Sequence, residues 1–218
     1  MTDFFLDKDN NDFPPVSSAA PDGLLAIGSN LNPETLLKAY RQGIFPWYME
    51  GDLIFWYHPD PRFVLFPGKL KISHSMRNIQ NKNVFRFTVD TAFPQVIKNC
   101  RMAKRKNQLG TWITDEFENA YHDLFLKGYA HSAEAWENNE LVGGLYGVLI
   151  GKVFFGESMF SSKSNASKFA FMKWVELLKK KGIELIDCQV YSPYLESLGA
   201  ELIPGTQFMD LLKKLIIK

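Results

Sequence analysis

The sequence lacks most of the features that mark metal-binding and disulfide-bonded proteins. Among its 218 residues only Cys100 and Cys188 are cysteines, and neither belongs to a CxxC pair. Both lie in apolar runs, so we expect buried free thiols in a reducing compartment. The four histidines are scattered, without an HxxxH spacing or cysteine companions. A metal site is therefore not expected.

Long hydrophobic runs and a large net charge are also missing. No apolar run approaches the roughly 18 residues that a membrane span needs. The N-terminus has neither the basic start nor the long apolar region of a signal peptide. We therefore expect a soluble, cytoplasmic protein. The formal net charge is +1, so any nucleic-acid partner must be held by a local basic patch.

The usual nucleotide-binding motifs are absent. The chain has no GxxxxGKS or GxxxxGKT and no GxGxxG that opens a helix, so use of ATP or a dinucleotide is not expected. No GxSxG marks a nucleophilic serine, although the sequence alone leaves a Ser–His–Asp site open. We expect the protein to work without a cofactor.

What the sequence does contain is enough apolar material for a substantial core. It is 46% hydrophobic and 14% aromatic, and its length allows a small and a medium domain. Aromatic and proline residues are concentrated between residues 44 and 61, whereas strands and helices alternate from about residue 62. This change predicts a small N-terminal α/β domain, 1–61, and a larger domain, 62–218. The aromatic cluster is either a packing interface, which we favour, or a wall for a planar ligand.

The expected elements of 62–218 predict an α+β domain with a mostly antiparallel sheet. The pattern indicates strands at 131–137, 141–150 and 152–160, a helix at 165–181, a strand within 183–190, and closing helices. This order is similar to the acetyltransferase-like (GNAT-like) fold, in which the strand after the long helix separates from its neighbour and opens a cleft. Fold analogy alone predicts no substrate.

Two polar residues interrupt the apolar strand expected within 183–190. Side chains alternate along a strand, so Asp187 and Gln189 should share one face. Polar groups on a buried strand need partners, so they are either a satisfied pair or the floor of a site. Glu157 lies in another apolar strand. If the two strands are neighbours, the three polar side chains converge on a cleft with apolar walls, as in a small-ligand site.

Ten short motifs resemble the bacterial leucyl/phenylalanyl-tRNA–protein transferase family in order and spacing. They are GLLAIG at 23–28, YRQGIFPW at 40–47, PDPR at 59–62, GTWIT at 110–114, AHS at 130–132, LVGGLYG at 141–147, GESMFS at 156–161, NASK at 165–168, LIDCQ at 185–189 and SLGA at 197–200. The resemblance implies an enzyme that moves leucine or phenylalanine, and methionine less readily, from tRNA to the N-terminal Arg or Lys of a protein. It also implies that the acceptor is marked for the N-degron pathway.

The resemblance also implies roles for individual residues. Asp187 and Gln189 match the catalytic pair, and Glu157 matches the residue that we expect to hold the donor's α-ammonium. The pocket for the donated side chain matches Leu145, Met159, Trp174 and Ile186. The aromatic residues around the terminal adenosine match Trp47, Trp112 and Phe154. The tRNA patch matches Arg77 and Lys82, with Lys98, Arg101 and 104–106 as the alternative basic surface.

The chemistry of this reaction fits a site without metal or ATP. The donor is an ester that the tRNA has already activated, and an α-amine with a pKa of about 7.7–8.0 is partly neutral at pH 7. Positioning therefore matters more than base strength. An amide oxygen is too weak a base to keep a proton. We expect Asp187 to orient Gln189, Gln189 to align the amine, and the leaving ribose oxygen to take the proton.

Three points stay open on the sequence. The family often has a histidine where this chain has Tyr194, so Tyr194 is assigned no role. A CoA-dependent N-acyltransferase is one alternative, which the loop at 160–167 disfavours because it contains no glycine to bind a pyrophosphate. A non-catalytic tRNA-binding module is the other. We expect a monomer.

Overall fold

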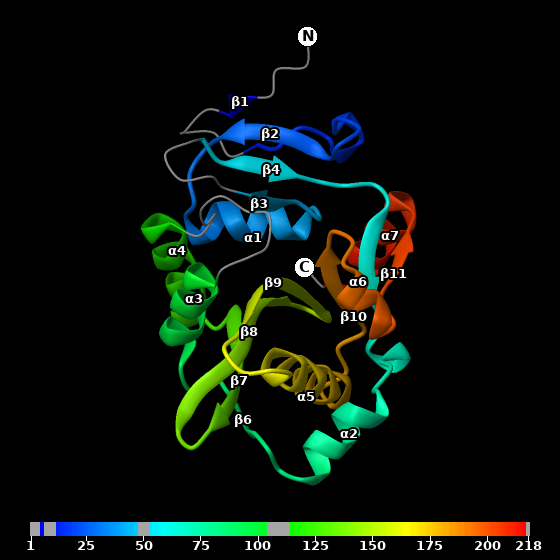
Figure 1. Cartoon of the computed structure of the whole chain (residues 1–218). Helices are drawn as coiled ribbons and strands as arrows, with labels where there is room; N and C mark the ends of the chain where they lie inside the picture. The colour runs from blue at the N-terminus through cyan, green and yellow to red at the C-terminus, as the bar shows by residue number, and fades with distance from the viewer. Residues whose placement is uncertain (1–4, 7–11, 48–52, 104–113, 217–218) are drawn as a thin grey trace.

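Figure 1 shows the protein as a computed structural model, which describes residues 5–6, 12–47, 53–103 and 114–216. A small sheet at the top of this view has the strand order β1-β2-β4-β3. Its strands are β1 (Phe5–Leu6), β2 (Leu24–Gly28), β3 (Phe45–Trp47) and β4 (Phe55–Tyr57). The described residues of the aromatic stretch, 44–47 and 53–57, form only short strands, as its proline and bulky side chains predict.

Helix α1 (Pro33–Arg41) connects β2 to β3 and begins after Asn32, a residue type that favours helix N-termini. The Asn32 side chain accepts a hydrogen bond from the Thr35 backbone N–H at 2.8 Å, and Pro33 occupies the first helical position. The buried face of the helix ends in Tyr40. This face packs toward the larger part of the protein, so Tyr40 reaches the region between the two sheets.

The larger sheet has seven strands in the order β11-β5-β10-β9-β8-β7-β6. They are β5 (Arg62–Leu65), β6 (Arg86–Val89), β7 (Ala130–Glu137), β8 (Glu140–Ile150), β9 (Val153–Ser161), β10 (Leu185–Gln189) and β11 (Glu201–Ile203). Every neighbouring pair is antiparallel except β9 and β10, which are parallel. The prediction of a mixed fold with a mostly antiparallel sheet is confirmed, including the β7–β8–β9 meander.

Helices cover both faces of the large sheet (Figure 1). They are α2 (His74–Asn81), α3 (Phe93–Met102), α4 (Asp115–Leu126), α5 (Ala166–Lys180), α6 (Pro193–Ser197) and α7 (Gly205–Leu215), with short 3-10 turns η1 (Val16–Ser18) and η2 (Pro67–Lys69). Because side chains alternate along a strand, the adjacent residues Phe154 and Phe155 enter two different cores. One core joins α3, α4 and α7 to the small sheet, and the other lies under α5.

The parallel pair β9–β10 is short and then separates. Its register runs from Leu185 opposite Val153 to Asp187 opposite Phe155. Glu157 on β9 and Gln189 on β10 lie beyond the last paired residues. The strand after the long helix therefore diverges from its neighbour, and the polar residues lie at the point of divergence.

Candidate functional site

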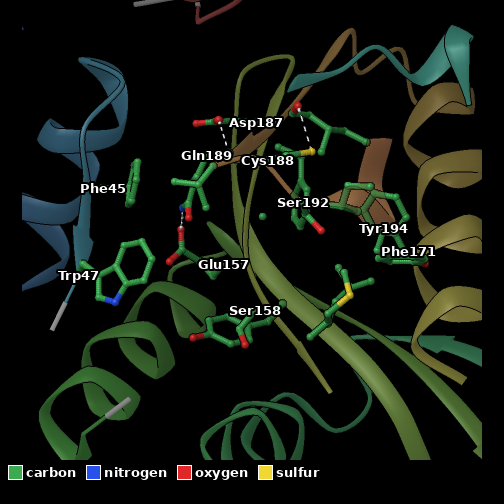
Figure 2. A pocket seen from close by; sticks show the side chains of 18 of the residues that line it. Phe45, Trp47, Glu157, Ser158, Phe171, Asp187, Cys188, Gln189, Ser192 and Tyr194 are labelled. Atoms are coloured by element: carbon green, nitrogen blue, oxygen red, sulfur yellow. Dashed lines mark hydrogen bonds between the residues drawn. The ribbon is translucent and has the colours of Figure 1, made fainter. Parts of the chain in front are cut away.

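A cavity of about 320 Å³ occupies the space where β9 and β10 separate. Figure 2 shows its walls, which come from β3, β8, β9, β10, α5 and the segment around α6. Eight of the expected site residues line it, namely Trp47, Leu145, Phe154, Glu157, Met159, Ile186, Asp187 and Gln189. The fold thus brings together residues that span more than 140 positions of the chain.

Trp174 was expected in the same pocket, but it does not line the cavity. The residue is buried on α5, and its ring packs edge-on against Phe154 with centroids 5.3 Å apart. Phe154 lines the cavity, so Trp174 lies one layer behind the wall. A helix that covers a sheet carries large apolar residues on its inner face. Sequence periodicity does not distinguish those that pack in the core from those that line a cavity. Trp112 lies outside the described residues.

Asp187 forms a buried ion pair with Arg62 of β5. Arg62 donates from Nε to Oδ1 at 2.8 Å and from Nη2 to Oδ2 at 2.6 Å, and both side chains are fully buried. The guanidinium also lies between the rings of Phe45 and Phe208, at 4.8 Å and 4.7 Å from their centroids. The charge of Asp187 is therefore balanced, and its position is fixed by a planar, bidentate partner.

The end of β10 is irregular at Gln189, although the side chains of Asp187 and Gln189 both point to the side of the strand opposite Cys188 (Figure 2). The pairing of β10 with β5 shifts between Asp187 and Gln189, and Gln189 has a φ of 64°. This left-handed conformation is uncommon for a residue with a side chain, and a bulge re-aims the side chain that follows it. Asp187 Oδ1 stabilises the turn by accepting the Gln189 backbone N–H at 2.9 Å. Asp187 thus acts on Gln189 through the backbone.

The Gln189 side chain points to Glu157. Its Nε2 donates to Glu157 Oε1 at 2.7 Å, as Figure 2 shows. Because a carboxylate only accepts, this contact assigns Nε2 to the Glu157 side and leaves Gln189 Oε1 as the other end of the amide. Glu157 and Gln189 therefore meet in the cavity, as expected. Asp187 also lines the cavity but contacts only the backbone of Gln189 and not Glu157.

Two tyrosines complete the surroundings of Glu157. Tyr40 of α1 donates to Oε1 at 2.7 Å, and the Tyr121 hydroxyl of α4 lies 3.1 Å from Oε2. The two hydroxyls also form a hydrogen bond with each other. Burial raises the pKa of Glu157 from 4.5 to about 7, although hydrogen bonds from both tyrosines oppose this rise. Burial, followed by the charge of Glu157, raises the pKa of both phenols, so they stay protonated.

Sequence reasoning missed Arg62, Tyr40 and Tyr121. Arg62 opens an apolar strand, and a buried guanidinium requires a carboxylate, so its pairing with a buried aspartate was a detectable signal. Both tyrosines lie on the apolar faces of helices, α1 and α4, where a sequence pattern indicates packing alone. A buried phenol needs a hydrogen-bond partner, but nothing in the sequence identifies which polar group supplies it.

Two further side chains line the cavity without an expected role. Tyr194 lies beside Phe171 in Figure 2, and its hydroxyl is buried with no hydrogen-bond partner among the described residues. Cys188 is a free thiol, and burial raises its pKa, so the sulfur is a neutral thiol rather than a nucleophilic thiolate. Cys100 is a free, buried thiol, as expected.

The two candidate basic surfaces differ in how their charges are used. Arg77 on α2 and Lys82 just after it are exposed, and within the described part of the chain neither forms an ion pair. Arg101 on α3 instead binds Asp115 and Glu118. Lys98 is exposed, and residues 104–106 lie outside the described ranges. Arg77 and Lys82 are therefore better placed than Arg101 to contact a phosphate, because Arg101 is already paired with two carboxylates.

The described residues contain no group of three His, Cys, Asp or Glu side chains that could hold a metal ion. None of their helices is both long enough and apolar enough to span a bilayer.

Comparison with known proteins identifies relatives over nearly the whole chain. A family model described as Leucyl/phenylalanyl-tRNA protein transferase matches residues 64–213, and the model of that transferase's N-terminal domain matches residues 29–60. A Leucyl/phenylalanyl-tRNA–protein transferase of Flavobacterium johnsoniae is 53% identical over 201 residues, covering 92% of this chain and 95% of that protein. One from Syntrophus aciditrophicus is 54% identical over 202 residues, covering 93% and 84%.

Solved structures resemble the chain less closely. The structure of L-PGS from Bacillus licheniformis superposes with a TM-score of 0.48 at 13% identity, over 73% of this chain and 65% of that one. This similarity is too low to assign roles to residues of the cavity.

Proposed function

Because the chain belongs to the leucyl/phenylalanyl-tRNA–protein transferase family, we propose that it transfers leucine or phenylalanine from aminoacyl-tRNA to the N-terminal Arg or Lys of proteins. Methionine is a poorer donor, and the acceptor is marked for N-degron proteolysis. The observation that carries this proposal is the cavity between β9 and β10, which has apolar walls and Glu157 and Gln189 at one side. No step requires a cofactor.

The apolar wall of the cavity receives the donated side chain. Leu145, Met159 and Ile186 come from three adjacent strands and line one continuous surface. A slot of this kind accepts side chains that are unbranched at Cβ. A misplaced methyl group costs about 1–3 kcal/mol, which is enough to disfavour isoleucine and valine.

Glu157 holds the α-ammonium of the donor. A carboxylate has about four acceptor positions. Oε1 uses two of them, for Tyr40 and Gln189, and Oε2 contacts Tyr121. A position on Oε2 is therefore left for an ammonium, and an ion pair inside a cavity with restricted access to water is stronger than one at the surface.

Aromatic side chains at the mouth of the cavity hold the terminal adenosine. Trp47 is 38% exposed and packs edge-on against Tyr57, which leaves one ring face available for stacking. Phe154 lines the cavity below it. Trp112 is proposed as the third member on the sequence match alone. Stacking of a base on an aromatic ring contributes about 1–3 kcal/mol.

Gln189 aligns the amine that attacks the ester. Its Nε2 is held by Glu157, so Oε1 is the end of the amide that can accept a hydrogen bond from the amine. The backbone contact to Asp187 fixes the unusual conformation of the residue. Since the carboxylate of Asp187 already binds Arg62 and this N–H, its role is to position Gln189, and the leaving ribose oxygen takes the proton.

The tRNA body contacts the exposed charges of Arg77 and Lys82. The architecture that supports these sites comprises an N-terminal domain, 1–61, and an acetyltransferase-like domain, 62–218. The separate sheets, the β7–β9 meander, the long helix α5 and the divergence of β10 from β9 support this division and this likeness. The enzyme acts as a cytoplasmic monomer.

The test is a transfer assay with labelled Leu-tRNA or Phe-tRNA. We expect label to enter a peptide that starts with Arg and not a matched peptide that starts with Ala. A CoA-dependent acyltransferase would instead be stabilised against heat by acetyl-CoA and would leave the tRNA label in place. A non-catalytic module would bind tRNA without transfer, and binding would survive combined Asp187→Ala and Glu157→Ala substitutions.

A further inference from the structure

Glu157, Tyr40 and Tyr121 form a closed ring of three oxygen–oxygen contacts. Tyr40 Oη lies 2.7 Å from Glu157 Oε1, Tyr121 Oη lies 3.1 Å from Oε2, and the two hydroxyls contact each other. Each hydrogen bond needs one hydrogen between its oxygens. The two phenols supply two hydrogens for three contacts. If Glu157 is ionised, one contact has no hydrogen.

Among the described residues, the groups around this ring supply no unpaired cation that would favour a carboxylate. Tyr40 faces Glu157 from α1, Tyr121 from α4, and Asp187 from β10. Arg62 of β5 binds Asp187 in a bidentate pair rather than Glu157. Tyr146 of β8 lies against Tyr121, with ring centroids 5.6 Å apart. Burial accordingly raises the pKa of Glu157 to about 7, so both protonation states are accessible near neutral pH.

We propose that Glu157 carries a proton on Oε2 in the free protein and releases it when the α-ammonium of the donor binds. In the free protein Oε2–H donates to Tyr121, Tyr121 donates to Tyr40, and Tyr40 donates to Oε1, so all three contacts are satisfied. Oε1 already accepts from Gln189, which places the proton on Oε2. Tyr40 and Tyr121 are positioning residues in this scheme. The inference rests on the proposed function.

The exchange of the proton for the ammonium is balanced. One proton leaves Oε2 for solvent, one N–H of the ammonium takes its place, and the chain Tyr121→Tyr40→Oε1 remains intact. No covalent bond other than O–H changes. Binding should therefore release protons below pH 7. Above about pH 8 the free amine is largely neutral and must gain a proton to bind, so the net exchange should reverse its sign.

The test is calorimetric titration with an amide-linked phenylalanyl-adenosine, which cannot be hydrolysed. Binding enthalpies measured in buffers of different ionisation enthalpy report the number of protons exchanged. We expect release of nearly one proton at pH 6 and net uptake at pH 8. The same compound without its α-amine, a phenylpropionyl-adenosine, should exchange none. Absence of release at pH 6, or equal release by both compounds, overturns the proposal.

Three variants assign the proton to the ring. Glu157→Gln keeps a donor at this position but does not titrate, so release at pH 6 should vanish. When Glu157 is protonated, Tyr121→Phe removes two hydrogen bonds, those of Tyr121 with Oε2 and with Tyr40. When Glu157 is ionised, it removes only the one with Tyr40. The variant therefore disfavours the protonated form, and proton release on binding at pH 7 should fall. If the phenols only stabilise a carboxylate, release at pH 7 rises instead, which contradicts the proposal. Tyr129→Phe, at a partly buried tyrosine outside the cavity, is the matched control.

The transfer assay separates this inference from the proposed function. If the wild type transfers to the Arg peptide but binding of the analogue releases no proton, the proposed protonation of Glu157 is overturned and the proposed function stands. Absence of transfer, or absence of binding of the analogue, overturns the function and the inference with it.

Discussion

Arg62 and Asp187 lie 125 positions apart and form a fully buried bidentate ion pair at the base of the cavity. The same carboxylate accepts the backbone N–H of Gln189, whose side chain binds Glu157. The arginine is thus linked to the reaction site through two further residues. This relationship explains why a strongly charged residue is kept in an apolar strand.

Replacing Arg62 by Met should destabilise the protein by about 3–5 kcal/mol, because Asp187 remains buried without its cation. Urea unfolding measures the loss. The matched control is Lys69→Met, which breaks the exposed pair with Glu201 and should cost about 1 kcal/mol or less. The combined change Arg62→Met and Asp187→Leu should regain stability but not transfer. A single Arg62→Met variant as stable as the control would show that the pair is not needed.

Replacing Gln189 by Asn should separate stability from transfer. Asparagine tolerates the left-handed conformation that Gln189 adopts, so the free energy of unfolding should change by less than about 1 kcal/mol. Its side chain is one methylene shorter and cannot reach both Glu157 and the amine, so kcat should fall about 100-fold. Single-turnover transfer measures this. Gln95→Asn on exposed α3 is the control, and wild-type kcat in Gln189→Asn would exclude the aligning role.

Replacing Leu145 by Phe should shift donor preference. Leu145 lines the apolar wall, and a larger ring there shortens the slot. Use of Phe-tRNA should fall at least tenfold more than use of Leu-tRNA, within the range of about 1–3 kcal/mol for a pocket contact. The ratio of the two kcat/KM values is the measurement. Leu149→Phe on the same strand does not line the cavity and should leave the ratio unchanged; an equal ratio in both variants would place the slot elsewhere.

Charge reversal at Arg77 or Lys82 should weaken tRNA binding and reduce its dependence on salt. Each lost phosphate contact lowers the slope of log affinity against log salt by roughly one. Lys98→Glu, on α3, tests the other surface. If only that variant changes the slope, the tRNA lies against α3 and the assignment to α2 is wrong.

Glu157 should make the protein less stable as pH rises. Its pKa is about 7 in the folded protein and 4.5 without burial, so between these values the folded state binds more protons than the unfolded state. Stability attributable to Glu157 is therefore present below pH 4.5 and is lost as pH rises through 7. The loss is at most roughly 3 kcal/mol, and smaller because cavity water reaches the side chain.

Thermal unfolding of Glu157→Gln from pH 4.5 to 8 checks this dependence. The variant should have a flatter profile and a higher Tm than the wild type at pH 8. Parallel profiles for the two proteins would mean that Glu157 is already ionised at acidic pH. Glu184→Gln, at an exposed carboxylate that binds Lys152, is the control and should leave the slope between pH 5 and 7 unchanged.

The sequence alone determined the family, the order of the elements and eight of the residues that line the cavity. Local signals account for this success. The cap at Asn32, the two-residue alternation in the β7–β9 meander and the apolar face of α5 each involve residues close together in the chain. Placing Glu157 and Gln189 at one site depended on whether β9 and β10 are neighbours, which the sequence left as a condition and the structure shows.

Only the tertiary structure decided how the polar residues are connected. The register shift and the left-handed backbone at Gln189 are not revealed by a period of two residues. The partners of Asp187 and Glu157 come from β5, α1 and α4, because a buried carboxylate is satisfied by whichever donors the fold brings to it. Those long-range contacts turn an expected pair into two linked networks, one that joins Arg62, Asp187 and Gln189 and one that joins Glu157, Tyr40 and Tyr121.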